Sequence, residues 1–592
     1  MRALRCCQSD SAEWPGEAAL ALLTPKAEEA TKLFNEKKYE EAEALALAVL
    51  DAAPNQRIAL RVLFEIRNAQ KRGKAADALG ARLAGLPGNA GQRAQANGHY
   101  AQYLIGQARY EAAIPFAAEV LKATPRAAQA HHVMGVVFTE TGALEAGERH
   151  YRKAAALSPV EDGMVLGNLA WNLKQQGRLT ESLALYEQAL ALRPDNMRGT
   201  GGKAQVLFAL GARGEAEAVL DGALARWPED KMLRLLRVMA DLAQDRPQAV
   251  LDRLNPAEPM VPPEILARGR AYMQLGQPQE AINAIAAARN IQRERGGLSF
   301  QPEALQAQIA RDKAYFTGDR LRPLPKAGPG AFMPVFLLGF PRAGSSLLEQ
   351  LLAQLPQFAA GDELAPISRL IDAISGMLGN QPYPEALDNM LVGDAAQVPD
   401  RLRALYEAPR SALARPGVRF ITDRAPGNVW HLGLIKLLYP EAPIIHVLRH
   451  PYDLVLANAA QDRRLETNAH AGLPALARYF DMQAQMLKHY RGELTLRYLP
   501  VRYEELVRDP DGEVRKILDF IGAESDLPGG FGLNNGAVPE PWPAHFALRR
   551  PVHPNAAGRY QAYQQALPKL FSEVAAILDL WVRELGYEEP TP

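Results

Sequence analysis

The chain has 592 residues, of which 48% are hydrophobic, and it carries 67 basic and 67 acidic side chains. This length exceeds what one core supports, so two or more domains are expected. The balanced charge gives no general argument for nucleic acid or an anionic membrane as a partner. The two cysteines, Cys6 and Cys7, are adjacent, so no disulfide framework is expected.

The first 24 residues lack the basic and apolar segments of a secretory signal, and we expect residues 1–24 to be a tail. No apolar run in the sequence reaches the roughly 18 residues that crossing a membrane requires. The sequence therefore predicts a cytoplasmic protein without a membrane span.

Residues 25–290 contain an internal repeat that is marked by regularly spaced prolines: Pro54, Pro87, Pro125, Pro159, Pro194 and Pro228. Successive spacings are 33, 38, 34, 35 and 34 residues. Each proline ends a helix-turn-helix unit, because proline cannot continue the helix before it. Mostly small residues stand twelve positions before these prolines: Ala42, Ala75, Ala113, Gly147, Ser182 and Ala216.

This pattern resembles the tetratricopeptide repeat (TPR), which implies an all-α superhelix of about seven repeats over residues 25–290. The groove of such a superhelix suits a protein or peptide partner, and the array is equally compatible with a homo-oligomer. Residues 291–331 end in a stretch rich in proline and glycine and are expected to be a connector. The second domain should then span residues 332–592.

The second domain opens with a predicted strand, a tight glycine loop and a helix. Residues 335–338 are wholly apolar, and leucines recur at helical spacing from residue 347. Between them, Gly339 and Gly344 have the spacing of the first half of a nucleotide P-loop. The P-loop lysine is missing, because Ser345 and Ser346 follow Gly344 and the cation is Arg342. The loop therefore predicts an anion site without the usual lysine and metal ion.

The stretch Phe-Pro-Arg-Ala-Gly-Ser-Ser-Leu at residues 340–347 resembles the 5′-phosphosulfate loop of sulfotransferases. The resemblance covers roughly residues 331–592 and is closest to tyrosylprotein and bacterial repeat-bearing sulfotransferases. It implies an α/β, P-loop-like domain with a parallel sheet flanked by helices. It also implies 3′-phosphoadenosine 5′-phosphosulfate (PAPS) as co-substrate, no metal, and donor contacts from five loop residues: Arg342, Ala343, Gly344, Ser345 and Ser346.

A second match implies a catalytic base. The stretch at residues 361–366 is similar to the family's Gly-Glu-Glu-Thr-Arg segment, which places Glu363 where the family has its proposed base. A carboxylate within reach of a hydroxyl can take its proton during attack on sulfur. Capping of the following helix by Asp362 and Glu363 remains an alternative. Ala365 stands where the family has an arginine, so one donor contact is missing.

Two further matches concern the 3′-phosphate. Arg449 follows a predicted strand at residues 442–448, where an arginine can grip a phosphate with both nitrogens. The family motif continues through Asp453 to a serine, which is Ala457 here. By resemblance, Arg559 supplies a second cation, and Arg550 stands where a basic residue is common.

A last match concerns the adenosine. The stretch Val-Arg-Tyr-Glu-Glu-Leu at residues 501–506 resembles a family segment whose tyrosine lies beside the adenosine, which implies that role for Tyr503. A tyrosine of the hydrophobic core is the alternative reading.

The resemblance implies a PAPS-dependent sulfotransferase that acts on a hydroxyl acceptor, with protein tyrosine, glycans and small molecules all open. Arg342 would stabilise the developing charge, and Glu363 would accept the proton. Two other functions stay open. A non-catalytic TPR scaffold with a degenerate second domain would fit Ala365 and Ala457, and predicts no PAPS binding. A nucleotide-dependent kinase predicts magnesium-dependent ATP binding, against which the missing P-loop lysine argues.

Overall fold

The structure is a computed structural model that describes residues 17–294, 299–361, 363, 367–379, 381–462, 465–524 and 557–587. The chain divides into two compact units, Met1–Ala216 and Glu217–Pro592, and this division falls inside a helix. The domain limits expected from the sequence remain predictions.

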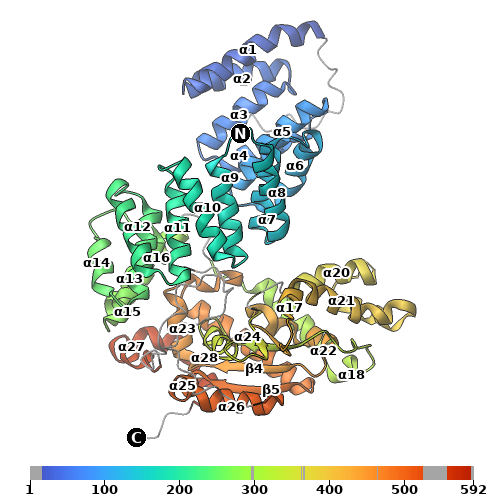
Figure 1. Cartoon of the computed structure of the whole chain (residues 1–592), viewed down its shortest axis with the longest axis vertical. Coiled ribbons are helices and arrows are strands. Elements are labelled where there is room, and N and C mark those ends of the chain that lie inside the picture. Colours follow the sequence, from blue (N-terminus) through green and yellow to red (C-terminus); the bar gives the residue numbers. More distant parts are fainter. Residues whose placement is uncertain are drawn as a thin grey trace. The chain divides into compact units, whose positions relative to one another are not determined.

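The first unit consists of successive helix pairs (Figure 1). The helices are α1 (Glu17–Asn35), α2 (Tyr39–Ala52), α3 (Arg57–Ala69), α4 (Gly73–Gly85), α5 (Ala90–Gly106), α6 (Tyr110–Ala123), α7 (Ala128–Glu140), α8 (Leu144–Leu157), α9 (Gly163–Gln175), α10 (Leu179–Leu192), α11 (Met197–Leu210) and the start of α12 (Arg213–Arg226). Helix α1 begins within the stretch expected as a tail.

Small residues let these helices pack closely. A Cβ atom on Gly202 would lie 2.4 Å from the ring of Tyr186, and one on Gly135 would lie 2.6 Å from the ring of Tyr151. Both tyrosines are buried. Contact between the backbone of one helix and a large ring from another therefore depends on the small residue, as the repeat pattern predicts.

The second unit begins with the rest of α12 and continues with α13 (Lys231–Ala243), α14 (Pro247–Arg253), α15 (Pro262–Gln274), α16 (Pro278–Glu294), α17 (Glu303–Tyr315) and α18 (Gly318–Leu321). Helices α17 and α18 occupy residues that were expected to be a connector. Tyr315 and Phe316 at the end of α17 are buried in the same core cluster as the sheet that follows. This stretch is therefore packed structure.

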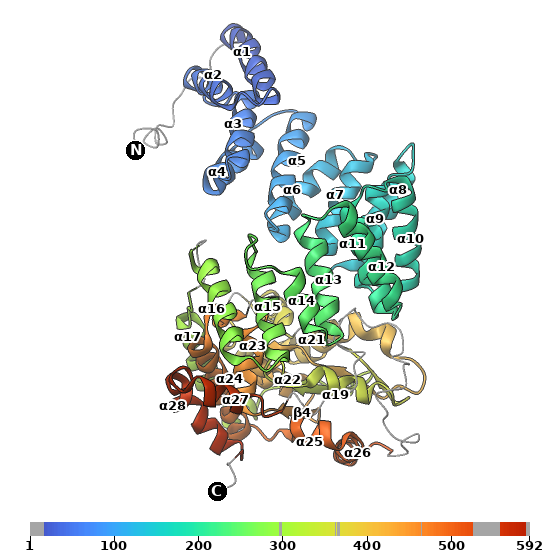
Figure 2. The same ribbon diagram turned by 90° about the vertical axis from the view of Figure 1, so that its left-hand side faces the viewer.

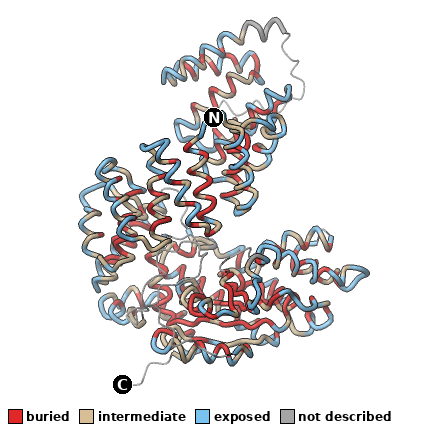
Figure 3. The backbone as a smooth tube through the Cα atoms, in the orientation of Figure 1, coloured by how far each residue is buried: buried red, intermediate tan, exposed pale blue. Residues whose placement is uncertain are grey.

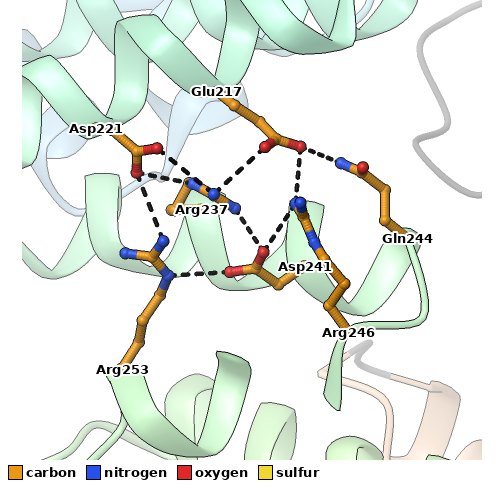
Figure 4. A network of polar contacts seen from close by, with 7 residues as sticks. All are labelled: Glu217, Asp221, Arg237, Asp241, Gln244, Arg246 and Arg253. Atoms are coloured by element: carbon orange, nitrogen blue, oxygen red, sulfur yellow. Dashed lines mark hydrogen bonds and ion pairs between the residues drawn. The ribbon is translucent and has the colours of Figure 1, made fainter. Parts of the chain in front are cut away.

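Ion pairs join α12, α13 and α14 (Figure 4). The network contains Glu217, Asp221, Arg237, Asp241, Gln244, Arg246 and Arg253. Asp241, whose side chain is 1% exposed, binds Arg237 at 2.6 Å, Arg246 at 2.9 Å and Arg253 at 3.0 Å. Three guanidinium groups face three carboxylates, and this balance offsets the cost of burying the charges.

The sheet of the second unit has five parallel strands in the order β2-β3-β1-β4-β5. The strands are β1 (Met333–Leu338), β2 (Phe358–Ala359), β3 (Phe420–Asp423), β4 (Pro443–Leu448) and β5 (Arg497–Arg502). In register, Phe336 of β1 pairs with Asp423 on one side and Ile444 on the other. The chain passes from β1 to the edge strand β2, returns to β3, which lies between them, and then crosses to β4 on the other side of β1, so β1 and β4 flank the point where the strand order reverses.

Helices surround this sheet, and buried residues concentrate along the strands and the helices against them (Figure 3). They are α19 (Ser345–Leu352), α20 (Ser368–Leu378), α21 (Val398–Glu407), α22 (Leu432–Leu438), α23 (Pro451–Ala459), α24 (Leu473–Glu493), α25 (Tyr503–Arg508), α26 (Pro510–Ile521), α27 (Tyr560–Ala566) and α28 (Pro568–Glu584). The predicted fold class, a helical repeat array followed by a parallel sheet flanked by helices, is confirmed. Among the described residues, no helix combines the length and apolar content that crossing a membrane requires.

We predict that Asp241→Asn loosens α13, because it leaves the buried guanidinium group of Arg237 and those of Arg246 and Arg253 with two carboxylates. Native-state hydrogen exchange of the full chain should show the local opening free energy at α13 falling by about 3 kcal/mol. Asp252→Asn, on an exposed position of α14, is the matched control and should change it by less than about 0.5 kcal/mol. Equal protection of α13 in the two variants would contradict a stabilising role for the network.

Candidate active site

The loop between β1 and α19 forms a cradle of backbone amides. Gly344 adopts φ 114° and Arg342 adopts φ 70°, both in the left-handed region. The amide of Ala343 donates to the carbonyl of Phe340 at 2.9 Å, which closes the turn. The first amides of α19, from Ser345 onward, have no carbonyl partner inside their own helix and carry partial positive charge. The loop can therefore bind an anion through its backbone, as the sequence predicts.

Gly344 is required on two grounds. Its backbone conformation is strained for any residue with a side chain. A Cβ atom there would also lie 2.6 Å from the ring of Tyr503, which comes from the start of α25. The loop after β1 and Tyr503 are thus in direct contact, although about 160 residues of sequence separate them.

Arg449, directly after β4, bonds to the loop after β1. Its Nη1 donates to the carbonyl oxygen of Arg342 at 3.1 Å, and its guanidinium lies 4.7 Å from the centre of the Tyr503 ring. On α23, Nδ2 of Asn458 donates to the carbonyl of Pro341 at 2.7 Å. Asn458 follows Ala457, the position where the family has serine, so this end of α23 still holds the loop. The loop that carries Arg342 and the segment after β4 that carries Arg449, which we call the two basic corners, therefore meet at one place.

The charges of three arginines act on Tyr503. Burial raises the pKa of Tyr503, and the charges of Arg449, Arg559 and Arg342 oppose that shift. Arg449 is in contact with the ring, its guanidinium lying 4.7 Å from the ring centre. A cluster of this charge at the carboxyl ends of β1 and β4 suits a ligand with more than one anionic group.

Asp453 fixes the position of Arg559. Its carboxylate accepts bonds from the amides of Gly558 at 2.6 Å and Tyr560 at 2.9 Å, the two neighbours of Arg559. Burial raises the pKa of Asp453, while the charge of Arg449 and these two bonds lower it. Asp453 of the Arg449 motif therefore holds the chain segment that carries Arg559.

His450, next to Arg449, does not add a positive charge. Its ring stacks on Tyr560 with centroids 4.1 Å apart, and burial lowers its pKa to about 4. It is neutral at physiological pH. The positive charge near the end of β4 therefore comes from arginine side chains, which stay protonated across the physiological pH range.

Glu363 belongs to a second group of contacts, in which its carboxylate is bound by Arg424. The Nη1 of Arg424 binds Glu363 Oε1 at 2.9 Å, and its Nε binds Oε2 of Glu349 at 2.6 Å. Glu349 is fully buried on α19 and also accepts a bond from Oγ1 of Thr422 at 2.5 Å. Arg424 thus links Glu363 to the helix that begins at the loop. Glu363 itself remains 34% exposed, so its carboxylate is accessible.

Arg424 is positioned by the residue before it. Asp423 ends β3 and accepts bonds from the amide of Ala425 at 3.0 Å and from Nδ2 of Asn428 at 2.7 Å. Its other oxygen accepts from Nη2 of the buried Arg410 at 2.8 Å. These bonds fix the turn after β3, and they thereby fix the backbone from which the Arg424 side chain extends.

The structure brings most of the predicted site residues together: Arg342, Ala343, Gly344, Ser345, Ser346, Arg449, Tyr503 and Arg559. Glu363 connects to them through Arg424 and Glu349. Glu349 was not predicted, although an acid on the leucine-rich face of α19 is a signal that could have found it. Asp362, Ala365 and Arg550 lie outside the described residues. Within the described parts of the chain, no cluster of three or more His, Cys, Asp or Glu side chains could hold a metal.

Two family models match this chain. Residues 334–526 match the model described as "Sulfotransferase family". Residues 101–162 and 168–231 match the model of the tetratricopeptide repeat. The first match covers the loop after β1, Glu363, Arg449 and Tyr503, and it ends before Arg559.

The chain is also similar to two curated proteins. An uncharacterized protein of Aquifex aeolicus is 27% identical over 225 residues, which are 36% of this chain and 28% of that protein. The nodulation protein NoeE of Sinorhizobium fredii is 28% identical over 211 residues, or 32% of this chain and 49% of that protein. The chain thus spans half or less of the length of these relatives.

Among solved structures, the sulfotransferase domain from the olefin synthase of Synechococcus PCC 7002 is 22% identical and has a TM-score of 0.31, over 45% of this chain and 98% of that one. PilW, a type IV pilus biogenesis factor, is 20% identical with a TM-score of 0.29, over 33% of this chain and 92% of that one. On the evidence of the two family models, the chain carries a domain of the sulfotransferase family behind an array of tetratricopeptide repeats.

Proposed function

We propose that the protein is a PAPS-dependent sulfotransferase that transfers a sulfuryl group to a hydroxyl acceptor. The observation that carries this proposal is the bond from Arg449 to the carbonyl of Arg342, which unites the two basic corners around Tyr503. PAPS has anionic groups on both sides of its ribose, and a site with two joined basic corners suits such a molecule. A cytoplasmic location is part of the proposal.

Each part of the donor has candidate partners in the chain. The amides of residues 343–346 and the hydroxyls of Ser345 and Ser346 would hold the 5′-phosphosulfate. Arg449 and Arg559 would bind the 3′-phosphate, a group that ATP lacks. Tyr503, with its ring against Gly344 and Arg449, would lie along the adenosine.

The transfer forms a bond between the acceptor oxygen and sulfur and breaks the bond between sulfur and the bridging oxygen of the donor. Glu363, oriented by Arg424, would accept the acceptor's proton. Negative charge then develops on the bridging oxygen, where Arg342 and the loop amides would stabilise it. No group in this scheme needs a metal ion.

For the acceptor, we propose only a chemical class, a molecule that carries a hydroxyl group. Tetratricopeptide arrays commonly form a groove that suits an extended peptide, so a protein tyrosine is the hydroxyl that we would test first, with glycans and small molecules next. Labelled PAPS with a panel of such acceptors identifies the class directly.

The first test is binding of PAP, the desulfated product, by calorimetry of the full chain. Wild type should bind PAP without magnesium, and Arg449→Met should weaken binding by about 30-fold or more, because a charged pair to phosphate is lost. Arg508→Met, an exposed arginine on α25, is the control and should bind as wild type does. Binding of ATP with magnesium instead of PAP would favour a kinase, and binding of neither would favour a scaffold.

A second test separates catalysis from binding. Glu363→Gln keeps the size of the side chain but cannot accept a proton, so turnover should fall by about 10²- to 10⁴-fold. Affinity for PAP should stay within about twofold of wild type, since the acid is assigned to the acceptor side. Glu573→Gln, exposed on α28, serves as control. Full turnover by Glu363→Gln would show that another group takes the proton.

A further inference from the structure

The segment that carries Glu363 leaves the sheet early. Strand β2 has two residues, Phe358 and Ala359, and its described ladder with β3 ends at Ala359. Glu363 follows four residues after this last paired residue, so the ladder does not fix its position. Side-chain contacts from other elements must therefore hold the segment in place relative to the loop after β1.

Two such contacts come from β3 and the turn after it. The hydroxyl of Thr422 accepts a bond from the amide of Gly361 at 3.2 Å, two residues before Glu363. A Cβ atom on Gly361 would overlap the carbonyl oxygen of Thr422, so only glycine allows the chain to lie this close to β3. The second contact is the bond from Nη1 of Arg424 to Oε1 of Glu363 at 2.9 Å.

Both contacts lead to the same carboxylate, that of Glu349. Its Oε1 accepts a bond from Oγ1 of Thr422 at 2.5 Å, and its Oε2 accepts one from Nε of Arg424 at 2.6 Å. The side chain of Glu349 is fully buried, and that of Arg424 is 5% exposed. Glu349 thus fixes the hydroxyl and the guanidinium group that together hold the segment of Glu363.

Glu349 is also one helical turn away from the loop that would bind the donor. It stands on α19, four residues after Ser345, the first residue of that helix. Helix α19 contacts β1 and α26, and Figure 2 shows α19 next to α26. The backbone hydrogen bonds of the helix set the distance from its first amides to Glu349. The donor loop and the contacts that hold Glu363 therefore share one rigid element.

Glu349 is unsuited to accept the proton itself. Each of its oxygens already accepts a bond, and its side chain is fully buried. Glu363, in contrast, is 34% exposed and can meet an acceptor. The two acids therefore have different tasks, although both bind Arg424.

We propose that Glu349 is a positioning residue for the transfer, which acts through Arg424 and Thr422 to place Glu363 at a fixed distance from the donor loop. This inference rests on the proposed function, because it assigns a supporting residue to the base of that reaction. In this role Glu349 touches neither donor nor acceptor. Its contribution to turnover should therefore disappear when Glu363 can no longer take a proton.

A double-mutant cycle on the full chain tests this role, with labelled PAPS and the acceptor that wild type sulfates fastest. Glu349→Gln keeps the size of the side chain but turns an NH2 group toward a donor. Turnover should fall by about 10- to 100-fold, the effect of misplacing a reacting group by about 1 Å. In the Glu363→Gln background the same change should alter turnover by less than about twofold. Affinity for PAP should stay within about twofold of wild type throughout.

Thr422→Val is the second variant, and it decides the question if Glu349→Gln does not fold. It removes the hydroxyl between Glu349 and Gly361 at nearly constant volume. Turnover should fall by about 5- to 10-fold, the loss of roughly one hydrogen bond, and should not fall further in the Glu363→Gln background. Glu303→Gln, exposed on α17, is the control and should change neither turnover nor PAP affinity.

The outcomes separate this role from the proposed function. Equal losses from Glu349→Gln in both backgrounds, or a parallel loss of PAP affinity, would indicate a purely structural role and overturn the inference. Wild-type turnover by Glu349→Gln or by Glu363→Gln would overturn it as well, while sulfation by wild type would still support the sulfotransferase. Failure of wild type to bind PAP and to sulfate any acceptor would reject the proposed function itself.

Discussion

The bond between Arg449 and the carbonyl of Arg342 is the contact on which the architecture of the site depends. It joins the ends of β1 and β4, the two neighbouring strands at which the strand order reverses. The left-handed loop, the close approach of Tyr503 to Gly344 and the arginines whose charges act on Tyr503 all lie at this junction. Strand order thus brings residues from distant parts of the sequence to one location.

Buried charge in this protein is of two kinds. Arg424 with Glu349, and Asp241 with its three arginines, are paired within the protein and stabilise local structure. The charges of Arg449, Arg559 and Arg342 all act on Tyr503. Several positive charges near one location lower the free energy of an anion that binds among them. This contrast separates the scaffold from the candidate site.

Much of this organisation could be predicted from the sequence, because the relevant signals are local. The proline period indicates the repeats, and an apolar run followed by glycines indicates the strand and loop around Arg342. Arg449 and Tyr503 are found by short motifs. The partner of Glu349 could not be predicted in this way. An acid on the leucine-rich face of α19 marks an unusual position, but only tertiary packing reveals that Glu349 is fully buried beside Arg424.

The division of the chain at Glu217 has an evolutionary consequence. Helices α13 to α16 belong to the unit that contains the sheet, and α15 and α16 share a core with it. Recombination that replaced all the repeats would remove part of the interior of this unit. Exchange of the helices that precede α12 would leave that interior whole, so a different helical array could be joined there without disturbing the packing of the sheet.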